Sequence, residues 1–143
     1  MRTHAAVALL LLLVAGCGGG LSKDELVAKG DAICKRVNTR MAKEPDPKSA
    51  ADLERLAKRT VAISDPAIKD MEALEPPDEL EKDFDKFVAS LKKQRDLTKK
   101  IGEAAGAGET AKIESIAGEA QKAQGEYRKL SDKIGFKECG GGT

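Results

Sequence analysis

Apolar side chains recur every three or four positions in four successive stretches between residues 22 and 134. This spacing gives each stretch one apolar face and predicts four amphipathic helices. No stretch shows the strict alternation of apolar and polar residues that is typical of a half-buried strand. In chain order, the expected apolar faces contain Leu26, Gly30, Ile33, Val37 and Met41; Leu53, Leu56, Thr60, Ile63, Ala67, Met71 and Leu74; Leu80, Phe84, Phe87, Leu91 and Ile101; Ile113, Ile116, Ala120, Ala123, Tyr127, Leu130 and Ile134.

Capping residues and prolines set the expected ends of the first two helices. Ser22, with Glu25 three positions later, has the pattern of a capping box. The first helix is therefore predicted from Ser22 to about Lys43, where a Glu-Pro-Asp-Pro segment ends it. Within that segment, Asp46 is the expected N-cap of the second helix and Pro47 its first helical residue.

Prolines and glycines also mark the later boundaries. Pro66 interrupts the second helix and predicts either a kink, which we favour, or a new helix that Asp65 caps. The proline pair at 76–77 separates the second helix from the third. The Gly106–Gly108 segment is the expected turn before the fourth helix, and Gly135 is a natural left-handed residue at its end.

Four amphipathic helices with short connections are typical of an up-down-up-down bundle. We therefore expect an all-α fold, with residues 22–143 forming a single four-helix domain and a short C-terminal tail. The core should be thin, because alanine is abundant and the chain has three Phe, one Tyr and no Trp.

The N-terminus has a different pattern. Ala5–Val14 is a run of ten apolar residues, about half the length that crosses a membrane, and it predicts a secretory signal peptide. The segment Val14–Cys17 that follows resembles the lipobox of bacterial lipoproteins. The resemblance implies that residues 1–16 are removed, that Cys17 carries diacylglycerol and often an N-terminal acyl chain, and that residues 17–21 form a lipidated tether. It places the protein on the outer face of the cytoplasmic membrane.

Removal of the signal segment changes the chemistry that is available. The whole chain has 25 basic and 24 acidic residues, and removal of Arg2 leaves the two equal. That balance argues against nucleic acid as a partner. The single histidine, His4, also leaves, so we expect no zinc site, no Ser-His-Asp or Cys-His catalyst and no cofactor. The acidic residues 78–85 are explained more simply by the start of a helix than by calcium.

Two cysteines remain once Cys17 is lipidated, namely Cys34 and Cys139. Disulfides persist outside the cytoplasm, so we expect these two to pair. In an up-down bundle the fourth helix ends near the start of the first. The extended segment 135–139 spans about 17 Å and can run back along the first helix to Cys34. The alternative is two unpaired, buried cysteines.

Four residues are candidates for ligand binding. Gln94 and Thr98 fall in line with apolar residues of the third helix, which indicates either a polar pocket lining or a partly exposed helix end. Gly118 and Gly125 lie seven residues apart on the fourth helix and indicate either a groove or the close approach of a neighbouring helix. In the second case the rings of Phe84 and Phe87 on the third helix would pack over the two glycines. A ligand carrier needs a cavity of about 300 Å³ or more. Because protein interiors are closely packed, we expect no such cavity, and we expect Gln94 and Thr98 to contact solvent or each other.

The expected function is a non-enzymatic, lipid-anchored binding or interaction module outside the cytoplasm. Its partner would be a protein or another component of the cell envelope. Recognition is expected at the membrane-distal turns, 44–47 and 106–108. The alternative is a carrier that holds a small apolar or amphipathic ligand between its helices. The mature part also resembles small, all-helical secreted domains with one cysteine in the first helix and another after the last, a resemblance that implies no activity.

Overall fold

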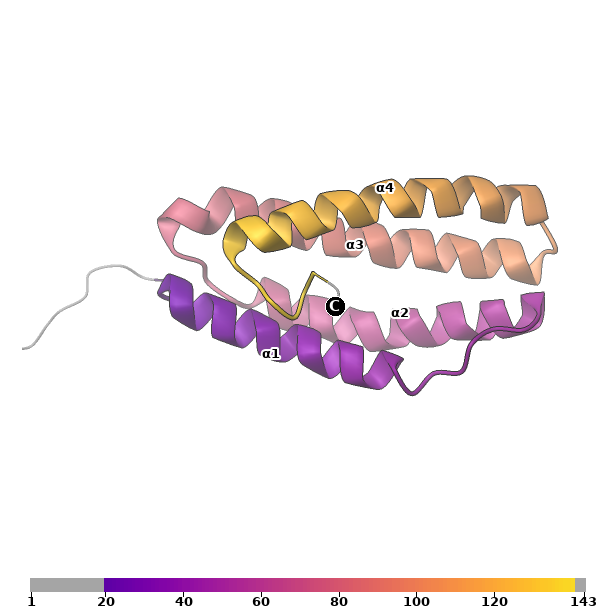
Figure 1. Cartoon of the computed structure of the whole chain (residues 1–143), viewed down its shortest axis with the longest axis horizontal. Coiled ribbons are helices and arrows are strands. Elements are labelled where there is room, and N and C mark those ends of the chain that lie inside the picture. Colours follow the sequence, from indigo (N-terminus) through magenta and orange to yellow (C-terminus); the bar gives the residue numbers. More distant parts are fainter. Residues whose placement is uncertain (1–19, 141–143) are drawn as a thin grey trace, which may run out of the picture.

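The computed structural model describes residues 20–140, and within them the chain forms four helices. The bounds are Lys23–Met41 for α1, Ala50–Glu72 for α2, Asp78–Gly106 for α3 and Thr110–Ile134 for α4. Residues 20–140 contain helices and no strand, which confirms the all-α fold. Successive helices run in opposite directions (Figure 1), which is consistent with the predicted four-helix bundle. The predictions for the signal segment 1–16, for Cys17 and for residues 141–143 lie outside the described residues.

The four helices do not contribute equally to the bundle. α3 is the longest, with 29 residues, and packs against both α2 and α4, whereas α1 has 19 residues and packs mainly on α2. The C-terminal tail returns from the end of α4 toward α1 (Figure 1). Since each helical residue advances the chain by 1.5 Å, α1 is about 15 Å shorter than α3. The connection between Met41 and Ala50 covers the remaining distance to the start of α2.

Most of the predicted helix ends are confirmed. Ser22 caps α1, and both hydrogen bonds of the capping box with Glu25 are present. Gly135 ends α4 in the left-handed conformation, with φ of 103°. α2 is continuous through Pro66, so the alternative of two helices divided at that residue is wrong. Pro66 itself is exposed.

The prediction for the start of α2 is wrong. The helix begins three residues later than Pro47, with Ser49 rather than Asp46 as its N-cap. The Ser49 hydroxyl accepts a hydrogen bond from the Asp52 backbone N–H at 3.1 Å. The Asp52 carboxylate accepts from the Lys48 N–H and from the Ser49 hydroxyl. The Ser49 hydroxyl thus satisfies one of the free N–H groups of the first turn, that of Asp52, whereas no hydrogen bond of this kind involves the Asp46 side chain.

The buried side chains form two clusters along the bundle. The larger cluster surrounds Phe87, which is fully buried, and draws on all four helices and the tail. The rings of Tyr127 and Phe136 lie 5.2 and 5.0 Å from that of Phe87, measured between centroids. The smaller cluster contains Leu97, Ala104, Ile116 and Ala123 and lies between α3 and α4. The core is therefore bulky near the chain termini and is built from smaller side chains toward the opposite end.

The predicted Cys34–Cys139 disulfide is present and joins α1 to the tail across 105 residues of sequence. Noncovalent contacts fix the same segment. Phe136 is 4% exposed and its ring lies against Gly30, while the Asp31 carboxylate accepts hydrogen bonds from the N–H groups of residues 137 and 138. The tail thus fills the space between α1 and α4, where the two helices have few direct contacts.

None of the helices formed by residues 20–140 has the length and the apolar composition needed to cross a membrane.

Candidate functional site

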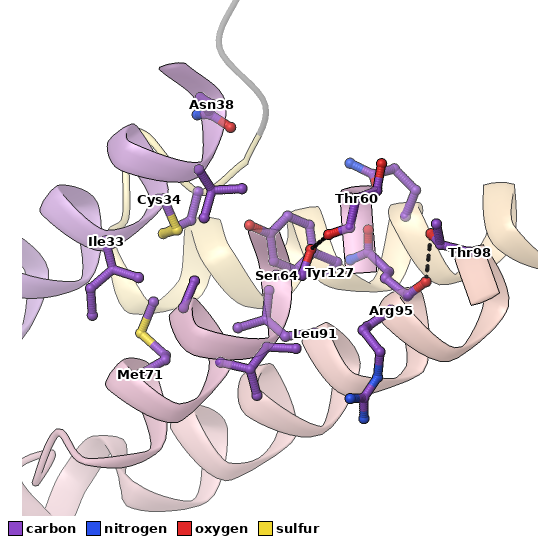
Figure 2. A pocket seen from close by; sticks show the side chains of 16 residues that line it. Ile33, Cys34, Asn38, Thr60, Ser64, Met71, Leu91, Arg95, Thr98 and Tyr127 are labelled. Carbon is purple, nitrogen blue, oxygen red and sulfur yellow. Dashed lines mark hydrogen bonds between the residues drawn. A yellow bond between two sulfur atoms is a disulfide. The ribbon is translucent and has the colours of Figure 1, made fainter. Parts of the chain in front are cut away.

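A pocket of about 230 Å³ lies in the middle of the bundle, between the two core clusters. All four helices contribute side chains to it, and Cys139 adds the tail (Figure 2). Asn38 of α1, which is exposed, and Gln124 of α4 are among the lining residues. The pocket therefore reaches the surface between α1 and α4, beyond the disulfide.

Most of the wall is apolar. The Cys34–Cys139 disulfide forms part of it, and the remaining apolar side chains, except that of Ile68, come from the faces predicted to be buried. They are Ile33, Val37, Ala67, Ile68, Met71 and Leu91. Such a wall favours an apolar ligand surface, because contact with it removes that surface from water.

Three hydroxyl groups on the wall donate to carbonyls of their own helices. Ser64 donates to the Thr60 carbonyl at 2.7 Å, and Thr60 donates to Leu56 at 2.9 Å. Thr98 donates to the Gln94 carbonyl at 3.0 Å, and two of these three bonds are drawn in Figure 2. The bonds use the hydroxyl hydrogens and leave the oxygens able to accept further hydrogen bonds.

Gln94 differs from these residues. Its Nε2 amide nitrogen is buried and has no hydrogen-bond partner among the described residues. An unsatisfied buried amide group costs about 1–3 kcal/mol. Because this nitrogen has almost no accessible surface, the free volume of the pocket does not reach it.

Tyr127 supplies a second polar group. Burial raises the pKa of its hydroxyl strongly above the usual value, and the negative charge of Asp31 adds to the effect. The phenol is therefore neutral at physiological pH. Tyr127 lines the pocket, and its neutral hydroxyl can donate or accept a hydrogen bond.

Arg95 is the one charged residue on the lining, and its guanidinium points away from the other labelled side chains in Figure 2. It bonds to Asp65 of α2 at 2.6 Å and lies 2.7 Å from the carboxylate of Asp96. The hydrogen bond to Asp65 is the main reason why the pKa of Arg95 is raised above its usual value. The charge of Arg95 is thus compensated outside the pocket, and the interior of the pocket presents neutral groups.

The structure brings some of the predicted site residues together and separates others. Gln94 and Thr98 both line the pocket, and the Cys34–Cys139 disulfide forms part of its wall. The pocket is smaller than the volume set above for a carrier. Cys17 lies outside the described residues.

Gly118 and Gly125 are exposed and do not line the pocket. The expected close approach of a helix at these glycines is wrong, because a β-carbon on either would meet nothing within 4 Å. The physical reason is helix geometry. Gly118 lies two positions from both Ile116 and Ala120, and at 3.6 residues per turn it is about 160° around the helix from each. Both glycines therefore face solvent.

Sequence reasoning did not single out Ser64, Thr60 or Gln124 as part of a site. Thr60 carried a signal, since it falls on the apolar face of α2, as Gln94 and Thr98 do on α3. A polar residue at a core-facing position of two different helices indicates a shared polar layer. Which helices meet there depends on how they pack.

Among residues 20–140, no group of three or more His, Cys, Asp or Glu side chains is arranged to hold a metal ion. Comparisons with protein-family models, with curated proteins and with solved structures found no match for this chain.

Proposed function

We propose that this chain is a lipid-anchored, non-enzymatic binding module on the outer face of the bacterial cytoplasmic membrane, and that it binds a small ligand in the central pocket. The observation that carries the proposal is the pocket itself, which has a volume of about 230 Å³ and a largely apolar wall built from all four helices and the tail. The pocket is below the volume of about 300 Å³ given above for a carrier, so the proposed ligand is smaller than a drug-sized molecule.

The start of the described chain supports the anchored arrangement. Leu21 donates its backbone N–H to the Glu75 carbonyl at 2.8 Å, and Gly20 lies against the Pro76 carbonyl. The connection between α2 and α3 is therefore close to the tether. Three extended residues from Gly20 to Cys17 span at most about 11 Å. A lipid on Cys17 would hold this end of the bundle at the membrane surface, with the far end of α3 about 43 Å away along the helix.

Two measurements test the proposal. Cell fractionation and intact mass should find diacylglycerol on a chain that begins at Cys17, and Cys17→Ala should abolish both processing and membrane retention. An unchanged distribution of Cys17→Ala would contradict the anchor.

Native mass spectrometry of the processed protein, extracted from membranes, should find a bound small molecule. Ser64→Leu places extra carbon atoms in the pocket and should remove that molecule, whereas Ser115→Leu, an exposed position on α4, should keep it. Equal retention by both variants would contradict binding in the pocket.

A second candidate function is recognition of an envelope protein at the distal end. A hollow of about 240 Å³ lies beside the connection between α1 and α2, where we expected a recognition surface. Glu44, Lys48 and Arg59 are among the charged residues that line it, and Arg59 bonds to Glu44 at 2.8 Å. Charge reversal at Asp46 and Lys48, both exposed, should abolish partner capture from membranes without lowering the melting temperature. Unchanged capture by that variant would count against this candidate.

A further inference from the structure

We propose that the half of the bundle far from the chain termini binds an amphipathic helix of a partner protein, in a groove between α2 and α4 that α1 is too short to cover. Half-buried apolar side chains of three helices line this distal groove. They are Leu53 of α2, Ile101 of α3, and Ile113, Ala117 and Ala120 of α4. The proposal does not depend on a ligand in the central pocket.

The distal groove continues the helix faces that line the central pocket. Leu53, Ile101 and Ala117 each lie seven residues from a pocket-lining side chain of the same helix. Those side chains are, in order, Thr60, Gln94 and Gln124. Residues seven positions apart differ by only about 20° around a helix, so each pair shares a face. The pocket and the groove are therefore successive parts of one space between α2, α3 and α4.

α1 and the tail cover these faces only in the half near the chain termini. Met71 lies eleven residues after Thr60 on α2 and is 1% exposed. Ser131 lies seven residues after Gln124 on α4 and is 0% exposed. Beyond Met41, where α1 ends, this cover stops (Figure 1). Since α1 has 19 residues and α3 has 29, about 15 Å of the groove lies beyond α1.

The connection between α1 and α2 follows a different face of α2. Glu44 in this connection accepts a hydrogen bond from Arg59 at 2.8 Å. Arg59 is one residue before Thr60 and is therefore about 100° around the helix from it. The charged hollow beside the connection is thus separate from the distal groove, whose apolar side chains remain partly exposed.

A helix is the occupant that this space fits. α2 and α4 have few direct contacts with each other, and near the chain termini a helix and the tail fill the space between them. A length of about 15 Å corresponds to about ten helical residues, or three turns. A helix satisfies its own backbone N–H and C=O groups, whereas an extended peptide would bury them against apolar side chains. An acyl chain is narrower than a helix and would leave part of the space unfilled.

The groove also determines the side chains of the partner. The α4 wall is formed in part by Ala117 and Ala120, and Ala104 and Ala105 are buried at the far end of α3. Small side chains on one helix leave room for large ones on the helix that faces it. The partner helix should therefore carry Leu, Ile or Phe every three or four positions on one face, and polar residues on the face toward solvent.

A second copy of this chain does not provide such a helix. The four helices of residues 20–140 already bury their apolar faces in their own core. A flat contact between two distal grooves, each about 15 Å long and one helix wide, would cover about 150 Å² on each copy. A stable interface buries about 800 Å² on each partner. The occupant is therefore a helix of another protein.

Site-specific photo-cross-linking in cells tests the proposal. The whole chain carries p-benzoyl-phenylalanine in place of Leu53, on the α2 wall, and irradiation attaches it to whatever lies in the groove. Mass spectrometry of the digested adduct should identify a segment of a second protein whose apolar residues recur every three or four positions. The same reporter in place of Gly118, which faces solvent, should not give this adduct.

A matched pair of variants on the opposite wall shows whether the adduct forms inside the groove. Ala117→Arg places a long charged side chain between α2 and α4 and should abolish the adduct of the Leu53 reporter, because a buried, unpaired charge is strongly unfavourable. Gly118→Arg, at the next residue, faces solvent and should preserve the adduct. Both variants should melt at the same temperature, since Ala117 is half-buried and its replacement reaches solvent when the groove is free. If Ala117→Arg does not fold, Ala117→Gln serves the same purpose.

Several outcomes would overturn the proposal. They are an adduct with a lipid, with a second copy of this chain or with a segment that lacks helical spacing, and an adduct that persists in the variant at Ala117. The absence of any adduct would mean that no partner helix occupies the groove and would overturn it as well. None of these results changes the test of ligand binding in the central pocket, which compares Ser64→Leu with Ser115→Leu.

Discussion

Opening the Cys34–Cys139 disulfide is expected to remove a large part of the stability of the bundle. The bond joins residues 105 positions apart in the sequence. In the chain-entropy model, a cross-link that closes a loop of about 100 residues stabilises the folded state by about 4.7 kcal/mol, since it restricts the unfolded chain. The total free energy of unfolding of a domain is only about 5–15 kcal/mol. The thin distal core makes such a contribution important here.

The native structure should survive the loss of the bond at low temperature. Phe136 remains buried against Gly30 and Phe87, and the Asp31 carboxylate still accepts the two N–H groups of the tail. The change is therefore mainly in the unfolded state. The entropy of unfolding is about 2.1 cal/mol/K per residue, or roughly 0.25 kcal/mol/K for roughly 120 residues, so a loss of 4.7 kcal/mol lowers the melting temperature by about 19 °C.

Thermal unfolding followed by circular dichroism, with and without a reductant, measures this shift. The double variant Cys34→Ala/Cys139→Ala should melt near the temperature of the reduced wild type and should not respond to reductant. A wild-type shift smaller than about 5 °C would refute the reasoning, because it would mean that the closed loop hardly restricts the unfolded chain.

Two further predictions follow from side-chain packing. Gly30→Ala should destabilise the domain by about 1–3 kcal/mol, because its β-carbon would lie 2.7 Å from Cζ of the Phe136 ring. Gly118→Ala, whose β-carbon would meet nothing within 4 Å, should instead stabilise the domain by up to about 1 kcal/mol. Denaturant titration measures both changes, and a Gly30→Ala variant as stable as the wild type would contradict the close contact. Tyr127, the single tyrosine, has a pKa raised by burial, so in the folded protein its ultraviolet titration should begin well above pH 10. The Tyr127 hydroxyl loses its proton at lower pH in the unfolded chain than in the folded protein. Its contribution to the free energy of unfolding is therefore complete below about pH 10 and declines as the pH rises further. A titration of the folded protein near pH 10 would contradict this prediction and would show that the ring is accessible to water.

Local sequence determined the helices and most of their ends. The apolar spacing predicted all four helices, and Ser22 and Gly135 marked the start of α1 and the end of α4, where the structure has them. The Cys34–Cys139 pair was also predicted from sequence, because the lipobox resemblance assigned Cys17 to lipidation and an up-down bundle brings the segments of the other two cysteines together. These features depend on interactions within a few residues, or on the direction of a helix, and both can be read along the chain.

Competition and packing decided the rest. Asp46 and Ser49 are both good N-caps, and only the arrangement of Lys48, Ser49 and Asp52 in space selected the second. Phe136 lies in a tail with no periodic pattern, yet its ring packs on Phe87 because α1 and α4 leave room for it. The pocket also depends on packing, because its wall combines side chains of all four helices with Cys139 of the tail. A sequence specifies which side chains face inward, whereas the volume left between them is a property of how whole helices pack.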